Sequence, residues 1–257
     1  MAAKTKLLRG VLLCAVIMLG APEAAAKCAS RSSWLAPGSG TALPKKPSLY
    51  LFVPKGGEYP LPASQLPLTL SDAKTRKLVV HRVTALDGQP SFDAYRIDIL
   101  DSGAFTLHVR LSFGEWDELQ ATYEVGRAEA KRDPGAVRIL STSESAYRWT
   151  CSWHATRNLH VSTSAPAFRV EFASSAEAYA SGPRGKVTVD ASRGNELQLG
   201  HVNCGGFTFP WGDEPLYLGV VALFSDGSES PLPREPTRVE PAPPRPERST
   251  APPRSRE

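Results

Sequence analysis

Two short segments carry the residue types best suited to chemistry. Cys151 and His154 form a C-x-x-H pair, and His201 and Cys204 form the mirror-image H-x-x-C pair. Two thiolates and two imidazoles are a ligand set that tetrahedral zinc accepts. A zinc site, and with it a zinc-dependent hydrolase, is therefore one hypothesis for this chain.

A disulfide between the same cysteines is the interpretation that we favour. If the large residues of the segment 149–153 share one face of a strand, His154 lies on the other face, and residues i and i+3 cannot reach one metal. In an oxidising compartment Cys151 and Cys204 are expected to pair across two strands, with Cys28 as the rival partner of either. The sequence thus predicts a Cys151–Cys204 disulfide, no metal and no cofactor.

Three aromatic residues around Pro210 are candidates for a ligand platform: Phe207, Phe209 and Trp211. Aromatic rings of this kind stack on the faces of sugars, but they also fill the cores of β-sandwiches. We expect the core role, and a carbohydrate-binding module remains the alternative.

Two groups of acidic residues lack the spacing that catalysis or calcium binding requires. Glu115, Asp117 and Glu118 cluster around one tryptophan, whereas glycoside hydrolysis needs two carboxyl groups set across a sugar. Asp98 and Asp101 do not have the regular oxygen-ligand spacing of a calcium loop. No serine stands in a G-x-S-x-G motif, so we expect no enzymatic activity.

The elements that must position these residues are strands with a period of two, separated by turns. Such alternation is typical of half-buried antiparallel strands, and no segment has the pattern of a helix. The sequence predicts an all-β chain of two antiparallel β-sandwiches. The expected strands span 48–53, 78–86, 94–100, 105–111, 119–125, 149–153, 168–172, 187–189, 197–202 and 216–224.

The first 26 residues have the pattern of a secretory signal peptide. Lys4, Lys6 and Arg9 precede an apolar run at 11–19, and the segment ends in small residues at 24–26. This run is too short for a membrane span, which needs about 20 apolar residues. We expect an exported protein, periplasmic or secreted, with no transmembrane span after cleavage.

Composition shifts divide the rest of the chain. A charged stretch that ends in Pro-Gly separates the two sandwiches, and a segment rich in proline and arginine follows the second and is expected to be disordered. The expected boundaries are a signal peptide at 1–26, sandwiches at 27–126 and 136–234, a linker at 127–135 and a disordered tail at 235–257.

The charge of the chain argues against nucleic acid as a partner. The leader carries three cations and one acid, so its removal lowers the formal net charge from +4 to +2. A nucleic-acid-binding protein would show a basic stripe with aromatic residues for stacking, and none is found. A protein or a polysaccharide of the cell envelope is the expected partner.

Two segments resemble known families. Residues 217–231 (YLGVVALFSDGSESP) are similar to the last hairpin of fibronectin type III and related immunoglobulin-like domains. Residues 34–51 (WLAPGSGTALPKKPSLYL) resemble the entry to bacterial immunoglobulin-like domains, and the whole pattern resembles exported proteins of high-GC bacteria. The resemblance implies two such sandwiches with a structural, adhesive or binding role at the envelope.

Overall fold

The computed structural model is mostly β, which confirms the all-β prediction. Strands account for most of the described chain, and α2 (Ala176–Ser181) is the one helix in it. The structure describes residues 33–54, 68–70, 78–82, 92–101, 103–112, 118–129, 135–149, 152–190, 195–201 and 214–241.

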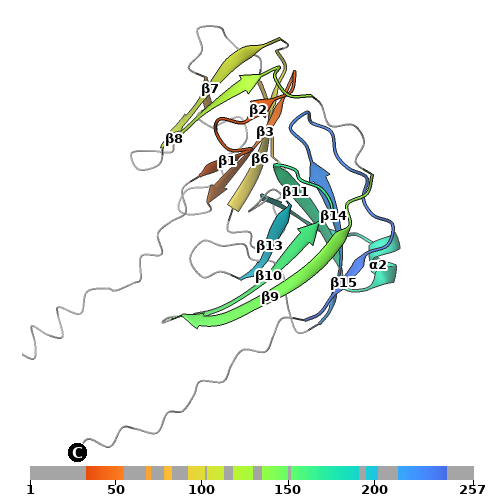
Figure 1. Ribbon diagram of the computed structural model, residues 1–257. Helices are drawn as coiled ribbons and strands as arrows, with labels where there is room; N and C mark the ends of the chain where they lie inside the picture. Colours follow the sequence, from red (N-terminus) through yellow and green to blue (C-terminus); the bar gives the residue numbers. More distant parts are fainter. Residues whose placement is uncertain are drawn as a thin grey trace, which may run out of the picture. The chain divides into compact units, whose positions relative to one another are not determined.

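Two sheets from the N-terminal half form what we call the first sheet pair (Figure 1). Sheet A has the order β1-β3-β6-β5, with β1 at Trp34–Ala36, β3 at Ser48–Pro54, β6 at Phe92–Ile99 and β5 at Leu78–Arg82. Sheet B has the order β2-β8-β7-β4, with β2 at Ala42–Leu43, β8 at Glu118–Val125, β7 at Phe105–Ser112 and β4 at Leu68–Leu70. All neighbours pair antiparallel except β2 and β8, which pair parallel.

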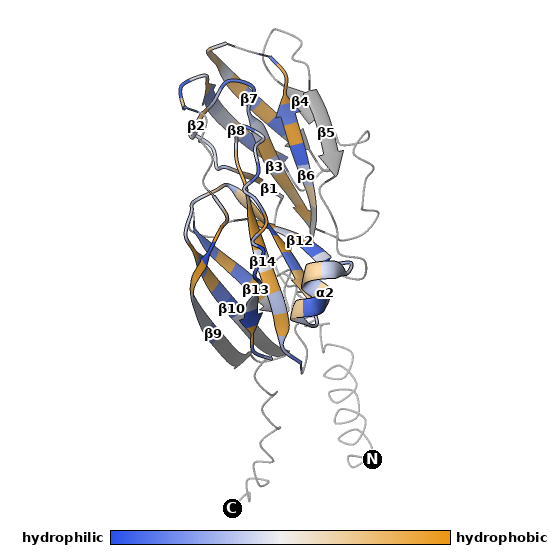
Figure 2. Ribbon diagram, turned by 90° about the vertical axis from the view of Figure 1, so that its right-hand side faces the viewer, coloured by the Kyte–Doolittle hydropathy of each residue, from blue (hydrophilic) through white to orange (hydrophobic). Residues whose placement is uncertain are grey.

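The first sheet pair encloses one apolar core. Alternate residues of its strands point into the core because side chains on a strand change face at every step. Figure 2 shows this alternation as orange and blue bands along β6. The buried core residues include Leu49, Leu51, Tyr95, Ile97, Leu107, Val109, Ala121 and Tyr123.

Two further sheets form the second sheet pair. Sheet C has the order β13-β10-β9, with β13 at Glu196–His201, β10 at Ser152–Val161 and β9 at Ile139–Trp149. Sheet D has the order β12-β11-β14-β15, with β12 at Gly185–Asp190, β11 at Ala167–Ala173, β14 at Leu216–Leu223 and β15 at Thr237–Val239. Their shared core includes Leu159, Val161, Phe168, Val170, Val187, Leu197, Leu218 and Val220.

The helix α2 was not expected from the sequence. Its six residues are too few to show a helical period, and its stability comes from local capping and one buried ring. Ser175 is the N-cap, and its side chain accepts a hydrogen bond from the Ala178 N–H at 3.0 Å. Tyr179, 1% exposed, anchors the helix.

Two other expectations need correction. Trp149 ends β9 and Trp153 belongs to β10, and the two strands pair antiparallel, so these residues do not share one strand as we expected. The tail was expected to start at residue 235, but β15 at Thr237–Val239 pairs with β14, and Val239 is 3% exposed in the core. This three-residue strand lies between prolines. Because the composition around it indicates disorder, the sequence did not predict it.

Two strands are apolar on both faces, and this joins the two sheet pairs. Leu49 and Leu51 of β3 point into the first core, while Tyr50 and Phe52 point outward. Val220 of β14 points into the second core, while its neighbour Val221 belongs to the outward cluster. We call this outward cluster the joint: it unites Ala36, Tyr50, Phe52 and Ala94 of sheet A with Ala167, Val221 and Leu223 of sheet D, with Trp34 and Leu232 packed against it.

Hydrogen bonds at the end of β14 add to the joint. The Ser48 N–H donates to the Ser225 carbonyl at 2.6 Å, and the Tyr50 hydroxyl donates to the Phe224 carbonyl at 3.3 Å. Gly227 forms a tight turn with φ +81°, and a Cβ there would lie 2.6 Å from Arg96 Nη2. The turn therefore requires glycine for its backbone conformation, and a Cβ would also displace the flexible end of the Arg96 side chain.

Candidate functional site

The face of sheet B that points away from the first core carries polar residues in register. Thr106 and His108 of β7 lie opposite Glu124 and Thr122 of β8. The Thr106 hydroxyl donates to Glu124 Oε1 at 3.0 Å, and His108 Nδ1 lies 3.1 Å from Thr122 Oγ1. Cross-strand pairs of this kind form a ladder along the sheet.

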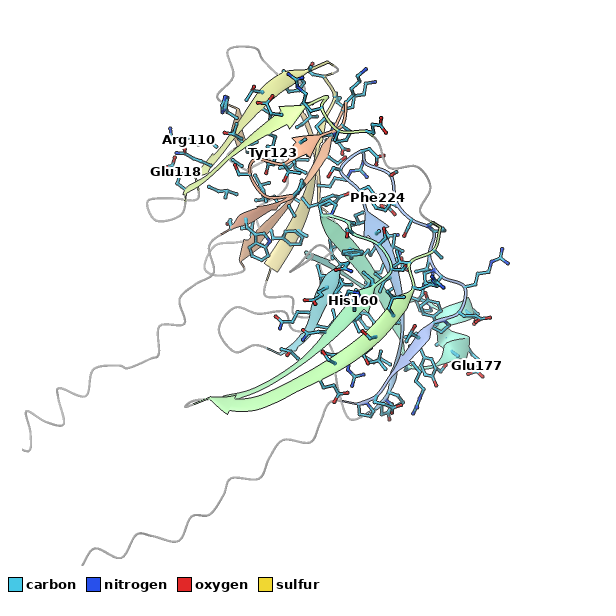
Figure 3. All side chains as sticks on the ribbon, viewed as in Figure 1. Arg110, Glu118, Tyr123, His160, Glu177 and Phe224 are labelled. Atoms are coloured by element: carbon cyan, nitrogen blue, oxygen red, sulfur yellow. The ribbon has the colours of Figure 1, made fainter. Side chains whose placement is uncertain are left out.

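The ladder continues through a salt bridge. Arg110 Nε lies 2.6 Å from Glu118 Oε1, and Gln120 Nε2 donates to the same carboxylate oxygen at 2.7 Å. Figure 3 shows Arg110 and Glu118 together at sheet B. The hydrogen bonds from Gln120 and Arg110 lower the pKa of Glu118, so the carboxylate stays ionised at neutral pH.

A turn of the chain borders this polar face. The Gly40 N–H donates to the Thr122 carbonyl at 2.8 Å, and the Thr122 N–H donates to Ser39 Oγ at 3.0 Å. These two hydrogen bonds hold the turn at Ser39 and Gly40 beside β8. Below it, the Tyr123 hydroxyl donates to the Pro37 carbonyl at 2.9 Å from the core side.

The turn and the two strands enclose a shallow hollow of about 250 Å³. Its walls are mainly polar and supply hydroxyl, amide, imidazole and guanidinium groups. The lining residues are Ser39, His108, Val109, Arg110, Gln120, Ala121 and Thr122. Such a hollow offers several hydrogen-bond donors and acceptors with little net charge.

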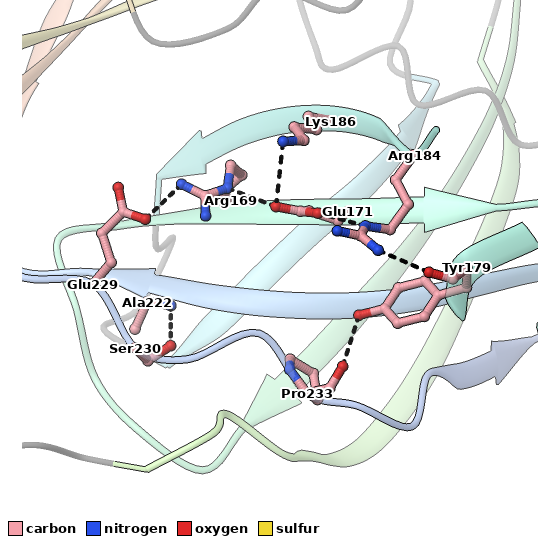
Figure 4. A network of polar contacts seen from close by, with 9 residues as sticks. All are labelled: Arg169, Glu171, Tyr179, Arg184, Lys186, Ala222, Glu229, Ser230 and Pro233. Atoms are coloured by element: carbon pink, nitrogen blue, oxygen red, sulfur yellow. Dashed lines mark hydrogen bonds and ion pairs between the residues drawn. The ribbon is translucent and has the colours of Figure 1, made fainter. Parts of the chain in front are cut away.

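A second polar cluster lies on the outward face of sheet D, around Glu171 (Figure 4). This carboxylate, 3% exposed, accepts hydrogen bonds from Arg184 Nε at 2.8 Å and Arg169 Nε at 3.0 Å, and Lys186 Nζ lies 3.8 Å away. Burial raises the pKa of Glu171, but the hydrogen bonds from Arg184 and Arg169 and the charge of Lys186 outweigh burial and lower it.

The Glu171 cluster connects the sheet to α2 rather than to a ligand. Arg184 donates from Nη1 to the Tyr179 carbonyl at 2.8 Å, and its guanidinium lies 5.4 Å from the centre of the Tyr179 ring. On the other side, Arg169 Nη1 bonds to Glu229 Oε2 at 2.7 Å. Each charged group is engaged within the chain, so the cluster is structural.

The four residues of the zinc-or-disulfide hypothesis are described only in part. His154 lies in β10 and His201 in β13, where His201 pairs with Ala155 and so is out of register with His154. Cys151 and Cys204 lie outside the described residues. Among the residues that the structure describes, no group of three or more metal-ligating side chains occurs. The Cys151–Cys204 disulfide and the zinc alternative both remain predictions.

The remaining candidate residues are also described only in part. Phe207, Phe209 and Trp211 lie outside the described part of the chain, so the aromatic platform stays a prediction. Glu118 is the first residue of β8, and Asp98 lies within β6, where it accepts hydrogen bonds from Ser48 Oγ at 2.5 Å and Arg96 Nε at 2.7 Å. Asp98 therefore lies in a strand and supports the joint.

Sequence reasoning did not identify the hollow on sheet B. The alternation of polar residues in β7 is plain in the sequence, and it predicts which face is solvated. The contacts across β7 and β8, and the return of the turn at Ser39 to β8, depend on register and on a long-range contact. A single sequence carries no direct signal for either.

No protein-family model matches the chain, and no curated protein is significantly similar to it. Across the described ranges, no helix is both long enough and apolar enough to cross a membrane.

Proposed function

We propose that this chain is an exported, non-enzymatic protein of the cell envelope that binds a hydroxyl-rich polymer through the hollow on sheet B. In this proposal the two sheet pairs are immunoglobulin-like or fibronectin-like sandwiches. The signal-peptide pattern of residues 1–26 supports export, and the turn at Gly227 supports the domain type. The disulfide between Cys151 and Cys204 would suit an oxidising compartment.

The polar lining of the hollow is the observation that carries the binding role. Ser39, Gln120 and Thr122 supply uncharged hydrogen-bonding groups, and His108 adds an imidazole at the exposed surface. Hydroxyl groups of a sugar pair with these groups in either direction, as donors or as acceptors. A volume of about 250 Å³ suits a small part of a long ligand, such as one ring of a polysaccharide.

The charge balance of the same face favours a neutral polymer over an ionic one. Arg110 is paired with Glu118, and Glu124 is bonded to Thr106, so neither sign of charge dominates. Charge complementarity would be required for tight binding of a nucleic acid or of a strongly acidic polymer. The face offers hydrogen bonds instead.

A binding assay with matched variants tests the proposal. Mature protein is incubated with insoluble envelope polysaccharides, and the bound fraction is measured for wild type and for the triple variant His108→Ala, Arg110→Ala, Gln120→Ala. We expect the triple variant to lose at least about tenfold in affinity, since several hydrogen bonds of about 1 kcal/mol each are removed.

The control is the double variant Thr106→Ala, Glu124→Ala, which removes a rung of the same ladder outside the hollow. It should bind like wild type. Equal binding by wild type and the triple variant would exclude the hollow as the binding site. Turnover of ester, peptide or glycoside substrates would contradict the non-enzymatic role, and a mature protein that keeps Met1 in the cytosol would contradict export.

A further inference from the structure

The outer edge of β9 belongs neither to an apolar core nor to the hollow on sheet B. β9 has 11 residues, is the longest of the described strands, and stands at one end of the order β13-β10-β9. No strand in the described ranges pairs with its other edge. Natural proteins usually shorten or block such an edge, because its backbone groups are a template for another chain.

The hydrogen bonds of β10 show which groups of β9 point outward. The Val161 N–H donates to Asn195, on the β13 side, and the Ser162 N–H donates to Arg138, on the β9 side. The backbone N–H and C=O groups of successive strand residues face opposite edges, so those of the even-numbered residues of β10 face β9. Their register partners are odd-numbered, such as Ser143 opposite Asn158. The even-numbered residues of β9 from Thr142 onward therefore direct their N–H and C=O groups away from the sheet.

The described side chains of β9 beyond Leu140 supply no apolar burial. Residues 141–144 are all exposed and all polar. Glu144 forms a salt bridge with Arg157 of β10, which is itself buried. A further strand along the edge would pair the outward backbone groups of this exposed stretch.

Few features of β9 protect the edge. Leu140 forms a bulge where β9 and β10 change register, and it is 55% exposed. From residue 141 to 149 the strand contains no proline and no lysine, the residues that most often block an edge. The open part of the edge thus lies between the bulge and Trp149, the last residue of β9.

We propose that β9 pairs antiparallel with β9 of a second copy of this chain, around a two-fold axis at Ala146. In this register Glu144 of each copy lies opposite Arg148 of the other, so the edge is complementary to itself in charge. An axis at Glu144 would instead place two glutamates opposite each other. Pairing around Ala146 extends over residues 143–149 of both copies and joins the two copies of sheet C into one sheet.

The C-terminal segment of the same chain is less suited than a second copy of β9 to pair with this edge. Residues 242–257 contain five prolines, each of which lacks the N–H that a strand must donate. Pairing between two copies needs no segment besides β9, and β9 keeps a full set of backbone donors there.

Sedimentation velocity of the mature chain over a range of concentrations up to millimolar tests the proposal. We expect a reversible monomer–dimer equilibrium for wild type. Ala146→Pro removes an outward N–H and no β9–β10 hydrogen bond, so we expect it to shift the dissociation constant at least about tenfold toward monomer. Hydrogen exchange should show that the outward amides of 144 and 148 are protected only at concentrations where wild type dimerises.

A second variant guards against misfolding of the proline variant. Arg148→Glu keeps every backbone donor but places like charges opposite each other, so it should also favour the monomer. Its control, Arg238→Glu, changes an exposed arginine of β15 by the same charge and should leave the dimer intact. A wild type that stays monomeric at all concentrations, or a dimer that both β9 variants leave unchanged, would overturn the proposal, as would concentration-independent protection of the outward amides.

Discussion

The outward faces of sheets A and B belong to the same sheet pair, but the face of sheet A is buried and the face of sheet B is exposed. On sheet A, Tyr50 and Phe52 are 1% and 0% exposed because sheet D covers them. On sheet B, His108 and Gln120 are exposed and border the hollow. The two faces share one core, so the difference lies in the outward residues alone.

The difference can be followed in the composition of single strands. In β3 the run LYLFV is apolar at consecutive positions, so both of its faces avoid water. In β7 the sequence FTLHVRLS alternates, so one face is buried and the other is solvated. A strand that lacks polar alternation therefore marks a place where a second layer covers the sheet.

Removal of an aromatic ring from the joint should have the largest effect on stability. Phe52 stacks on Trp34 with ring centres 5.1 Å apart and an angle of 11° between the planes. We expect Phe52→Ala to lower the free energy of unfolding by about 3–5 kcal/mol, because it leaves a cavity between two sheets. Urea denaturation measures the change, and a loss below about 1 kcal/mol would contradict burial of this face.

Removal of the buried carboxylate of sheet D should have the next largest effect. Glu171→Gln leaves Arg169, Arg184 and Lys186 facing one another without the central anion. We expect a loss of about 1.5–3 kcal/mol, toward the lower value because the cations are partly exposed to solvent. Thermal denaturation at neutral pH measures the loss, and an unchanged midpoint would show that the cluster does not stabilise the fold.

The same carboxylate predicts how stability depends on pH. The pKa of Glu171 is lower in the folded than in the unfolded chain, so the folded state favours the ionised form. Its contribution is complete above the ordinary glutamate pKa and is lost as the pH falls through the lowered folded value. Wild type should therefore lose more stability in acid than Glu171→Gln does, and equal acid sensitivity of the two proteins would contradict this prediction.

A substitution in the turn should have a smaller effect on the joint. Gly227→Ala places a Cβ at a positive φ and against Arg96, so we expect a loss of about 1–2 kcal/mol. Gly135 also has a positive φ, but a Cβ there meets no neighbouring atom, which makes Gly135→Ala the control for backbone strain alone. Equal losses in the two variants would show that the contact with Arg96 contributes nothing.

The smallest effect is expected on the exposed face of sheet B. Thr122→Ala removes a hydroxyl that lies near His108 at the rim of the hollow. We expect a change within about 0.5 kcal/mol, since exposed substitutions of this kind rarely alter stability. Denaturation under the conditions used for Phe52→Ala completes the comparison, and a loss above about 2 kcal/mol would mean that this face also packs against something.

Much of the fold can be predicted from alternation, whereas the contacts between sheets cannot. Strands such as β6, β7 and β8 follow from residues that change polarity at every step, and the turn at Asp226 and Gly227 follows from residues that tolerate a positive φ. The joint depends on two distant strands, β3 and β14. Their apolar runs indicate burial, but they do not show that these two strands pack against each other. The two residues between β9 and β10 in the sequence, 150 and 151, include no glycine or asparagine, the residues that usually mark a hairpin.

The candidate site was predictable to a smaller extent. The solvated face of β7 follows from its sequence, but the hollow requires the register with β8 and the return of the chain at Ser39. Residue types alone directed attention to Cys151 and Cys204. Pairs of cysteine and histidine are conspicuous in a sequence, whereas a hollow lined by threonine, serine and glutamine is not.

Calorimetric unfolding of the mature chain tests the joint most directly. If sheets A and D are buried against each other, the two sheet pairs should unfold together, with a calorimetric enthalpy equal to the van't Hoff enthalpy. Phe52→Ala should lower the midpoint of that one transition. Two separate transitions, of which Phe52→Ala shifts only the one that belongs to the first sheet pair, would contradict the account.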